Sequence, residues 1–117
     1  MLIRVDPSLS VPLFEQLADS VRAQIVTGAI GKGEKLPAAK ALAESLEMNV
    51  HTVLHAYQML RDEGIIDLHR GRGAVVRVSH GDYDALAESV ARLVAEAKAL
   101  GAPQAILTAM IREEYLR

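Results

Sequence analysis

The feature that most constrains this chain is a pair of short helix-forming segments joined by a very tight link. Apolar residues at helical spacing predict a helix over residues 39–46 and a second helix over about 50–63. Asn49, the last residue of the link, is a favourable N-cap for the second helix, and Gly64 supplies its stop. Two short helices connected in this way are typical of a helix-turn-helix.

The residues after this motif predict a β-hairpin. Two β-branched and aliphatic runs, at 65–68 and 74–78, flank a glycine-rich segment that contains Arg70 and Arg72. A hairpin directly behind a helix-turn-helix is the wing of a winged helix, and here its tip carries two arginines. A very short additional strand is expected over residues 34–36.

Helical spacing also predicts helices on both sides of this region. One covers residues 12–28, with Pro12 in its first turn, and a later one covers about 83–100, with Asp82 as its cap. A final short helix follows a Gly-Ala-Pro break. The expected fold class is mainly α with a small β wing: an N-terminal winged helix-turn-helix over residues 1–78 and a two-helix C-terminal dimerisation tail over 79–117.

Charge is distributed unevenly along the chain. The formal net charge is −2, and all of it arises from residues 79–117, because residues 1–78 hold equal numbers of basic and acidic side chains. Binding to phosphates depends on where cations cluster rather than on the total. The clustered cations are Lys32, Lys35, Lys40, Arg70, Arg72 and Arg77. The charge pattern is therefore compatible with a nucleic-acid partner.

Several classes of function are disfavoured by what the sequence lacks. Without cysteine there are no disulfides, thiolate nucleophiles or cysteine-ligated metals. No apolar run approaches the ~20 residues of a membrane span, and the start of the chain lacks a signal-peptide pattern. We therefore expect a cytoplasmic protein with no membrane partner. No catalytic motif or phosphate-binding glycine loop is recognisable, so an enzyme is not expected.

The second helix of the motif carries a polar face. Its predicted buried side chains are Val53, Ala56, Tyr57 and Leu60, and the opposite side holds His51, Thr52, His55 and Gln58. Such side chains can contact phosphates or base edges in a major groove, and the free amides at the helix start favour a phosphate. The alternative is an ordinary solvated face, but the wing that follows favours DNA.

The wing residues and the histidines each allow two interpretations. Arginines at a glycine-rich tip suit the narrow minor groove of DNA, although the same pattern occurs in hairpins with solvated charges. His51 and His55 stand four residues apart, a spacing that can bind zinc or nickel. No third ligand occurs at a telling distance, so we predict no metal site and no cofactor.

Several short stretches of the sequence, in their residues and their spacing, resemble the pattern of one known family. These stretches are Leu-Pro-Ala-Ala-Lys-Ala-Leu-Ala at 36–43, Met-Asn-Val-His-Thr-Val at 48–53, Ala56-Tyr57, Leu60, Glu63-Gly64 and Gly71-Arg72-Gly73. Over residues 11–78 the chain resembles the GntR family of bacterial regulators, and its short tail is similar to the YtrA-like subfamily. The resemblance implies a homodimer that binds an inverted-repeat operator in double-stranded DNA, often before transporter genes, and represses transcription.

The resemblance also implies which residues contact DNA. Carried over by position, these are Lys40, His51, Thr52, His55, Arg70, Gly71, Arg72 and Gly73, and the cap residue Asn49 is assigned with them. Three positions depart from the family pattern. Ala38 replaces a common serine, and Lys40 and His55 stand where arginine is usual. Neither lysine nor histidine reproduces the bidentate fork of arginine, so weaker anchoring or a different base preference is expected.

The tail is predicted to form the dimer. Its apolar positions are Tyr83, Leu86, Ala87, Val90, Val94, Ala97, Ile106, Met110 and Ile111. A second copy of the tail is the simplest partner for this stripe, and a twofold dimer would hold two recognition helices ~34–36 Å apart. Two helices are too short to enclose a metabolite pocket, so any small-molecule effector, of unknown identity, would bind between subunits or between the tail and the winged helix.

One other class of function remains open from the sequence. A winged helix can serve as a protein-interaction module without DNA binding. An apolar outward face on the second helix would favour that alternative, whereas His51, Thr52 and His55 are polar. A steep salt dependence of binding would favour DNA, and a mild one a protein partner.

Overall fold

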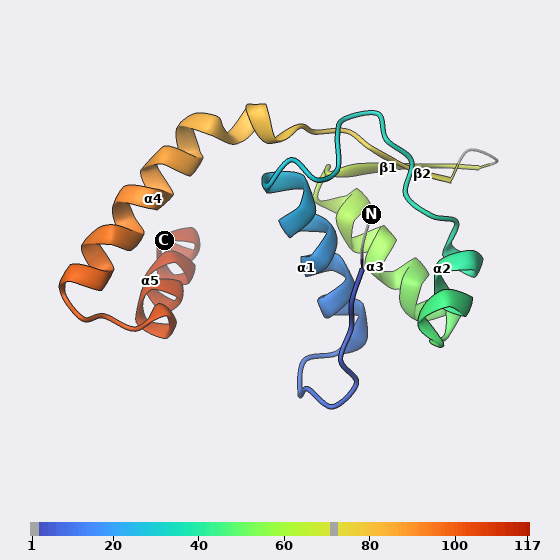
Figure 1. The fold of residues 1–117 in the computed structure, drawn as a ribbon, viewed down its shortest axis with the longest axis horizontal. Coiled ribbons are helices and arrows are strands. Elements are labelled where there is room, and N and C mark those ends of the chain that lie inside the picture. Colours follow the sequence, from blue (N-terminus) through green and yellow to red (C-terminus); the bar gives the residue numbers. More distant parts are fainter. Residues whose placement is uncertain (1–2, 71–72) are drawn as a thin grey trace. The chain divides into compact units, whose positions relative to one another are not determined.

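The computed structural model describes residues 3–70 and 73–117. It contains two compact units, Met1–Asp82 and Tyr83–Arg117. The elements in chain order are α1 (Leu13–Val26), α2 (Ala39–Leu46), α3 (Val50–Asp62), β1 (Ile66–His69), β2 (Gly73–Val76), a 3₁₀ turn η1 (His80–Tyr83), α4 (Asp84–Ala99) and α5 (Gln104–Leu116) (Figure 1). The prediction of a mainly helical fold with a small two-stranded wing is confirmed.

The core of the first unit lies where α3 packs against both other helices. In Figure 1, α1 and α3 lie side by side and α2 meets one end of α3. The largest fully buried side chains are aliphatic and come from α1, the loop after it, α3 and both strands: Leu17, Val21, Ile25, Ile30, Val53, Leu60, Ile66 and Val76. From α2, Leu42 and Ala43 join this core. Because these positions recur at helical spacing in α1 and α3, each helix buries one stripe and leaves the opposite side free.

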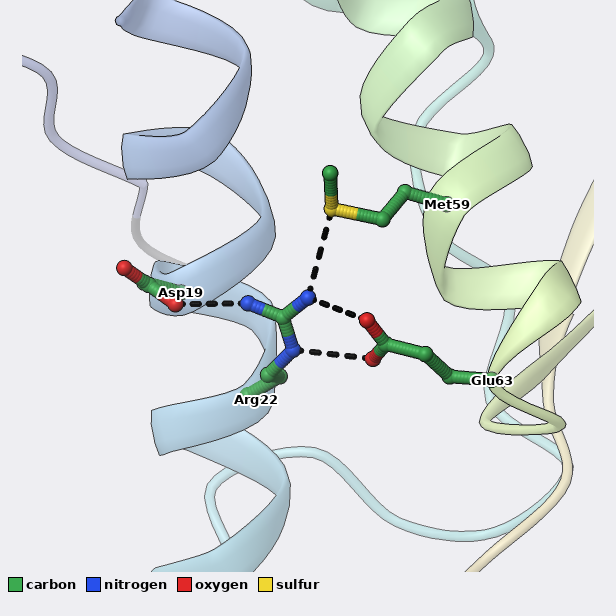
Figure 2. Close-up of polar contacts among 4 residues, drawn as sticks. All are labelled: Asp19, Arg22, Met59 and Glu63. Atoms are coloured by element: carbon green, nitrogen blue, oxygen red, sulfur yellow. Dashed lines mark hydrogen bonds and ion pairs between the residues drawn. The ribbon is translucent and has the colours of Figure 1, made fainter. Parts of the chain in front are cut away.

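A polar cluster joins the outer sides of α1 and α3 (Figure 2). The Nε of Arg22 donates to Glu63, 2.9 Å away, and its Nη2 donates to the other oxygen of the same carboxylate. Nη1 donates to Asp19 within α1, and Nη2 also lies 3.3 Å from the sulfur of Met59. The Glu63 carboxylate raises the pKa of Arg22. The guanidinium thus fixes the two helices in register.

The wing is a small antiparallel sheet built on α3. β1 and β2 pair from Ile66 opposite Val76 to His69 opposite Gly73. The short strand expected over 34–36 is present as a single bridge, Lys35 opposite Val75, with the amide of Leu36 donating to Ala74 at 2.9 Å. The sheet buries Ile66, Ala74 and Val76 on one face, and Asp67 and Val75, which alternate with them on the other face, are half-buried.

Two predictions about helix starts are wrong. Pro12 is the N-cap residue of α1 and not part of its first turn. The cap of α4 is Tyr83, without a side-chain hydrogen bond, whereas Asp82 accepts a 3.0 Å hydrogen bond from the amide of Ser79. The reason is that a 3₁₀ turn precedes α4, so that Asp82 closes this turn instead.

The second unit is a helical hairpin. α4 ends at Ala99 with Leu100 as its C-cap, and Gly101 follows with a φ of 70°, a left-handed conformation that glycine adopts without strain. Neither helix has a fully buried side chain, and Val94, Ala97 and Leu107 are half-buried between them. Among the helices of residues 3–70 and 73–117, none is long and apolar enough to cross a membrane.

Candidate nucleic-acid interface

The turn between α2 and α3 is shaped by two residues. Glu47 ends α2 in the left-handed region, with a φ of 54°, and reverses the chain direction. Asn49 then caps α3: its side-chain oxygen accepts a 2.7 Å hydrogen bond from the amide of His51. The predicted N-cap is therefore confirmed. The amide of Thr52 donates to the carbonyl oxygen of Asn49 at 3.0 Å. The positive end of the helix dipole at this start favours an anion.

The buried side of α3 is the predicted one. Its core residues are Val53, Ala56, Tyr57 and Leu60. On the side away from the core, His51, His55 and Gln58 are exposed, and Thr52 is half-buried. Leu54 is also exposed on this helix, with 37% of its surface accessible. Leu54 was not among the predicted site residues, although it lies one turn after His51 and one turn before Gln58, next to the polar face.

His55 is held by a ring contact that the sequence analysis did not anticipate. Its imidazole stacks on Phe14 of α1, with ring centroids 4.0 Å apart and planes inclined by 18°. Offset or parallel packing of this kind orients a ring and limits its rotamers. One face of the His55 ring is therefore engaged with α1, while the residue as a whole remains exposed.

The start of α2 is anchored to α3 by a tyrosine. The hydroxyl of Tyr57 donates a 2.7 Å hydrogen bond to the carbonyl oxygen of Pro37, and burial raises the pKa of this phenol. The bond fixes the segment that leads into α2. Lys40 is exposed in the first turn of α2, and Ala38, at its N-cap, has no side chain that could form a hydrogen bond. The hydrogen bond of Tyr57 thus connects α3 with the segment just before α2, the helix that carries Lys40.

The outer face of the wing gathers charged side chains. Asp67 on β1 lies 3.5 Å from the Nε of Arg77 and 3.9 Å from the Nε2 of His69. Arg70 is exposed at the end of β1, and Gly73 begins β2 with a φ of 76°. The remaining predicted tip residues, Gly71 and Arg72, lie outside the described residues.

The tail presents an apolar surface. Of the predicted dimerisation residues, Tyr83, Val94 and Ala97 are half-buried and the rest are exposed: Leu86, Ala87, Val90, Ile106, Met110 and Ile111. The prediction omitted Leu93, Leu100 and Leu107, which line an apolar hollow of 140 Å³ between α4 and α5. Leu93 and Leu100 lie seven residues apart on one side of α4, and the turn at Gly101 brings Leu107 of α5 beside them.

The described residues supply no third ligand beside the two histidines of α3. His51 and His55 share α3, but within residues 3–70 and 73–117 no group of three or more His, Cys, Asp or Glu side chains forms a metal-binding cluster. His80 lies elsewhere, with its ring close to Gly28 at the end of α1.

Comparison with known proteins identifies relatives of this chain. The family model for bacterial regulatory proteins of the gntR family matches residues 13–76. The HTH-type transcriptional repressor YtrA of Bacillus subtilis is 37% identical over 75 residues, which are 64% of this chain and 58% of that protein. The chain thus spans less than two thirds of this relative.

Solved structures share the fold. YtrA from Sulfolobus acidocaldarius, a GntR-family transcription factor, has a TM-score of 0.62 at 33% identity, covering 81% of this chain and 99% of that one. The DNA-binding domain of AraR, solved in complex with operator ORX1, has a TM-score of 0.57 at 23% identity, covering 65% of this chain and 95% of that one. With the family model matching more than half of its length, the chain belongs to the GntR family of bacterial regulatory proteins.

Proposed function

We propose that this chain is a transcriptional repressor that binds an operator in double-stranded DNA. The observation that carries the proposal is the capped α3, with its polar side free, followed directly by a wing whose outer face is rich in charge. The solved AraR domain, which has the same fold, was crystallised with its operator. Such a regulator acts on the chromosome, which implies a cytoplasmic location.

In the proposed complex, α3 enters the major groove and the wing reaches the adjacent minor groove. Groups at the starts of α2 and α3 contact phosphates, and side chains on the exposed side of α3 contact bases. The residues proposed to contact DNA are Lys40, Asn49, His51, Thr52, His55, Arg70, Gly71, Arg72 and Gly73. Since Ala38 offers no hydroxyl at the cap of α2, the amides and Lys40 must hold the phosphate there.

The tail is proposed to form a twofold homodimer. Leu86, Val90 and Met110 expose 61%, 47% and 60% of their surfaces, which is unfavourable for a helical hairpin in water. A second tail can cover this surface and, through the twofold axis, present two reading heads to an inverted repeat. Any small-molecule effector would bind at such an interface.

DNA binding is tested by selecting bound sequences from a pool of random duplexes and measuring the affinity of the enriched duplex against salt. We expect enrichment of an inverted repeat and a steep loss of affinity with rising salt, because each phosphate contact releases a counterion. No enrichment, or a mild salt dependence, would instead favour a protein partner. A Lys40→Gln variant should bind all duplexes more weakly, with a shallower salt slope, whereas Lys98→Gln in α4 serves as the charge-matched control.

Dimerisation is tested by sedimentation of the full chain and of a Val90→Asp, Met110→Asp variant. We expect a dimer for the wild type and a monomer for the variant, because a carboxylate cannot be buried in an apolar interface without a partner. The monomeric variant should lose tight binding to the full repeat and keep weak binding to a half-site. An unchanged oligomeric state would contradict the proposed interface. Glu88→Asp in α4 is a control that preserves charge.

A further inference from the structure

Leu54 occupies a position on α3 that the protein core does not explain. The buried stripe of this helix is complete without it, formed by Val53, Ala56, Tyr57 and Leu60. Leu54 nevertheless exposes 37% of its surface. A single exposed leucine is common on proteins, so its significance depends on its neighbours.

Those neighbours are the polar side chains on the exposed side of α3, here called the reading face: His51, His55 and Gln58. At 100° per residue, His51 and Gln58 lie within one turn of Leu54 on either side, and both are exposed. His55 lies on the other flank of the same face, where its ring is stacked on Phe14. The face therefore has an aromatic flank tied to α1 and an aliphatic flank, Leu54, that is accessible to a ligand.

The major groove of DNA offers one apolar group to such a side chain. Thymine carries a C5-methyl group there, while the other distinguishing features of base pairs are hydrogen-bond donors and acceptors. A leucine cannot form hydrogen bonds, but it can exclude water from a methyl group. We infer that Leu54 determines specificity by contacting the methyl group of one thymine in each half-site. This inference rests on the proposed function.

The test removes the methyl group from the DNA. Using the full chain and the enriched duplex, each thymine is replaced in turn by deoxyuridine, symmetrically in both half-sites, and the dissociation constant is measured. Burying one methyl group changes an affinity by about fourfold. We therefore expect one symmetric pair of positions at which uracil weakens wild-type binding by about 15-fold, the product of two half-sites.

The Leu54→Ala variant connects this loss to the side chain. It should bind the thymine and uracil duplexes with equal affinity, and selection with it should lose the thymine preference at that position. Because Leu54 is partly exposed and outside the buried stripe, circular dichroism should show an unchanged fold. Val26→Ala, which shortens an exposed aliphatic side chain at the far end of α1, is the matched control and should keep the uracil effect.

The outcomes separate the two claims. If the wild type binds an inverted repeat but tolerates uracil at every position, or if Leu54→Ala still discriminates against uracil, the assignment of Leu54 is wrong and the proposed function stands. If no duplex is enriched by the full chain, the proposed function fails and the assignment fails with it.

Discussion

The hydroxyl of Tyr57 in the middle of α3 donates a 2.7 Å hydrogen bond to the carbonyl oxygen of Pro37, twenty residues earlier in the chain. This bond connects the helix proposed to read DNA with the segment that leads into α2. The stack of Phe14 on His55 adds a contact between α3 and α1, so that specific contacts supplement the shared apolar core in orienting α3.

We expect the Tyr57→Phe substitution to lower the free energy of unfolding by about 1 kcal/mol, since the carbonyl of Pro37 loses its partner while the ring stays packed. Urea denaturation monitored by circular dichroism measures this change. Tyr115→Phe is the control: its side chain is 87% exposed, and removing its hydroxyl should leave stability unchanged. Equal effects of both substitutions would show that the bond to Pro37 contributes nothing.

The same tyrosine predicts a loss of stability in alkali. Burial raises the pKa of Tyr57 above the value of about 10 found in unfolded chains. Its contribution to stability is therefore complete below pH 10 and is lost as the pH rises above 10, because the unfolded state releases the proton first. Between pH 10 and 11, wild-type stability should fall by up to about 1 kcal/mol more than that of Tyr57→Phe. Parallel pH profiles would contradict this linkage.

The ion pair of Arg22 with Glu63 should contribute measurably to the packing of α1 on α3. We expect Glu63→Gln to destabilise the protein by about 1 kcal/mol, the upper end for partly exposed pairs, because the arginine geometry is bidentate. The loss should shrink in 1 M salt, where charges are screened. Asp62→Asn, which affects an exposed carboxylate paired with its neighbour Arg61, should have a smaller effect in the same urea titration.

The cap of α3 can be tested in the absence of DNA. Asn49→Ala removes the acceptor for the amide of His51 and should lower the free energy of unfolding by about 1 kcal/mol. Asn49→Asp retains an acceptor and should preserve stability. If alanine and aspartate variants melt at the same temperature, the side-chain cap is not what stabilises the start of α3.

Replacing Glu47 should stabilise the protein. A residue with a side chain in the left-handed region costs about 1–2 kcal/mol relative to glycine, part of which is offset by the greater freedom of glycine in the unfolded chain. We expect Glu47→Gly to raise the free energy of unfolding by about 1 kcal/mol. Glu44→Gly, in the last turns of α2, should do the opposite, by about the same amount. A destabilised Glu47→Gly variant would refute the argument.

The local structure of the winged helix-turn-helix follows from the sequence alone. Apolar spacing predicted α2 and α3 to within a residue at most ends, because a helix with one buried stripe leaves a strong periodic signal. Asn49 marked the start of α3, since a cap acts through the backbone two residues away. The glycines between two aliphatic runs marked the wing for the same local reason.

Only the tertiary structure decided how those elements present their side chains. The contacts of Phe14 with His55, Arg22 with Glu63 and Tyr57 with Pro37 join residues at least twenty positions apart, and no periodic pattern encodes such pairs. The exposure of Leu54 and the hollow between α4 and α5 likewise depend on which neighbours arrive from elsewhere in the chain. Periodicity selects the face that is buried, but packing between elements selects what each exposed residue can contact.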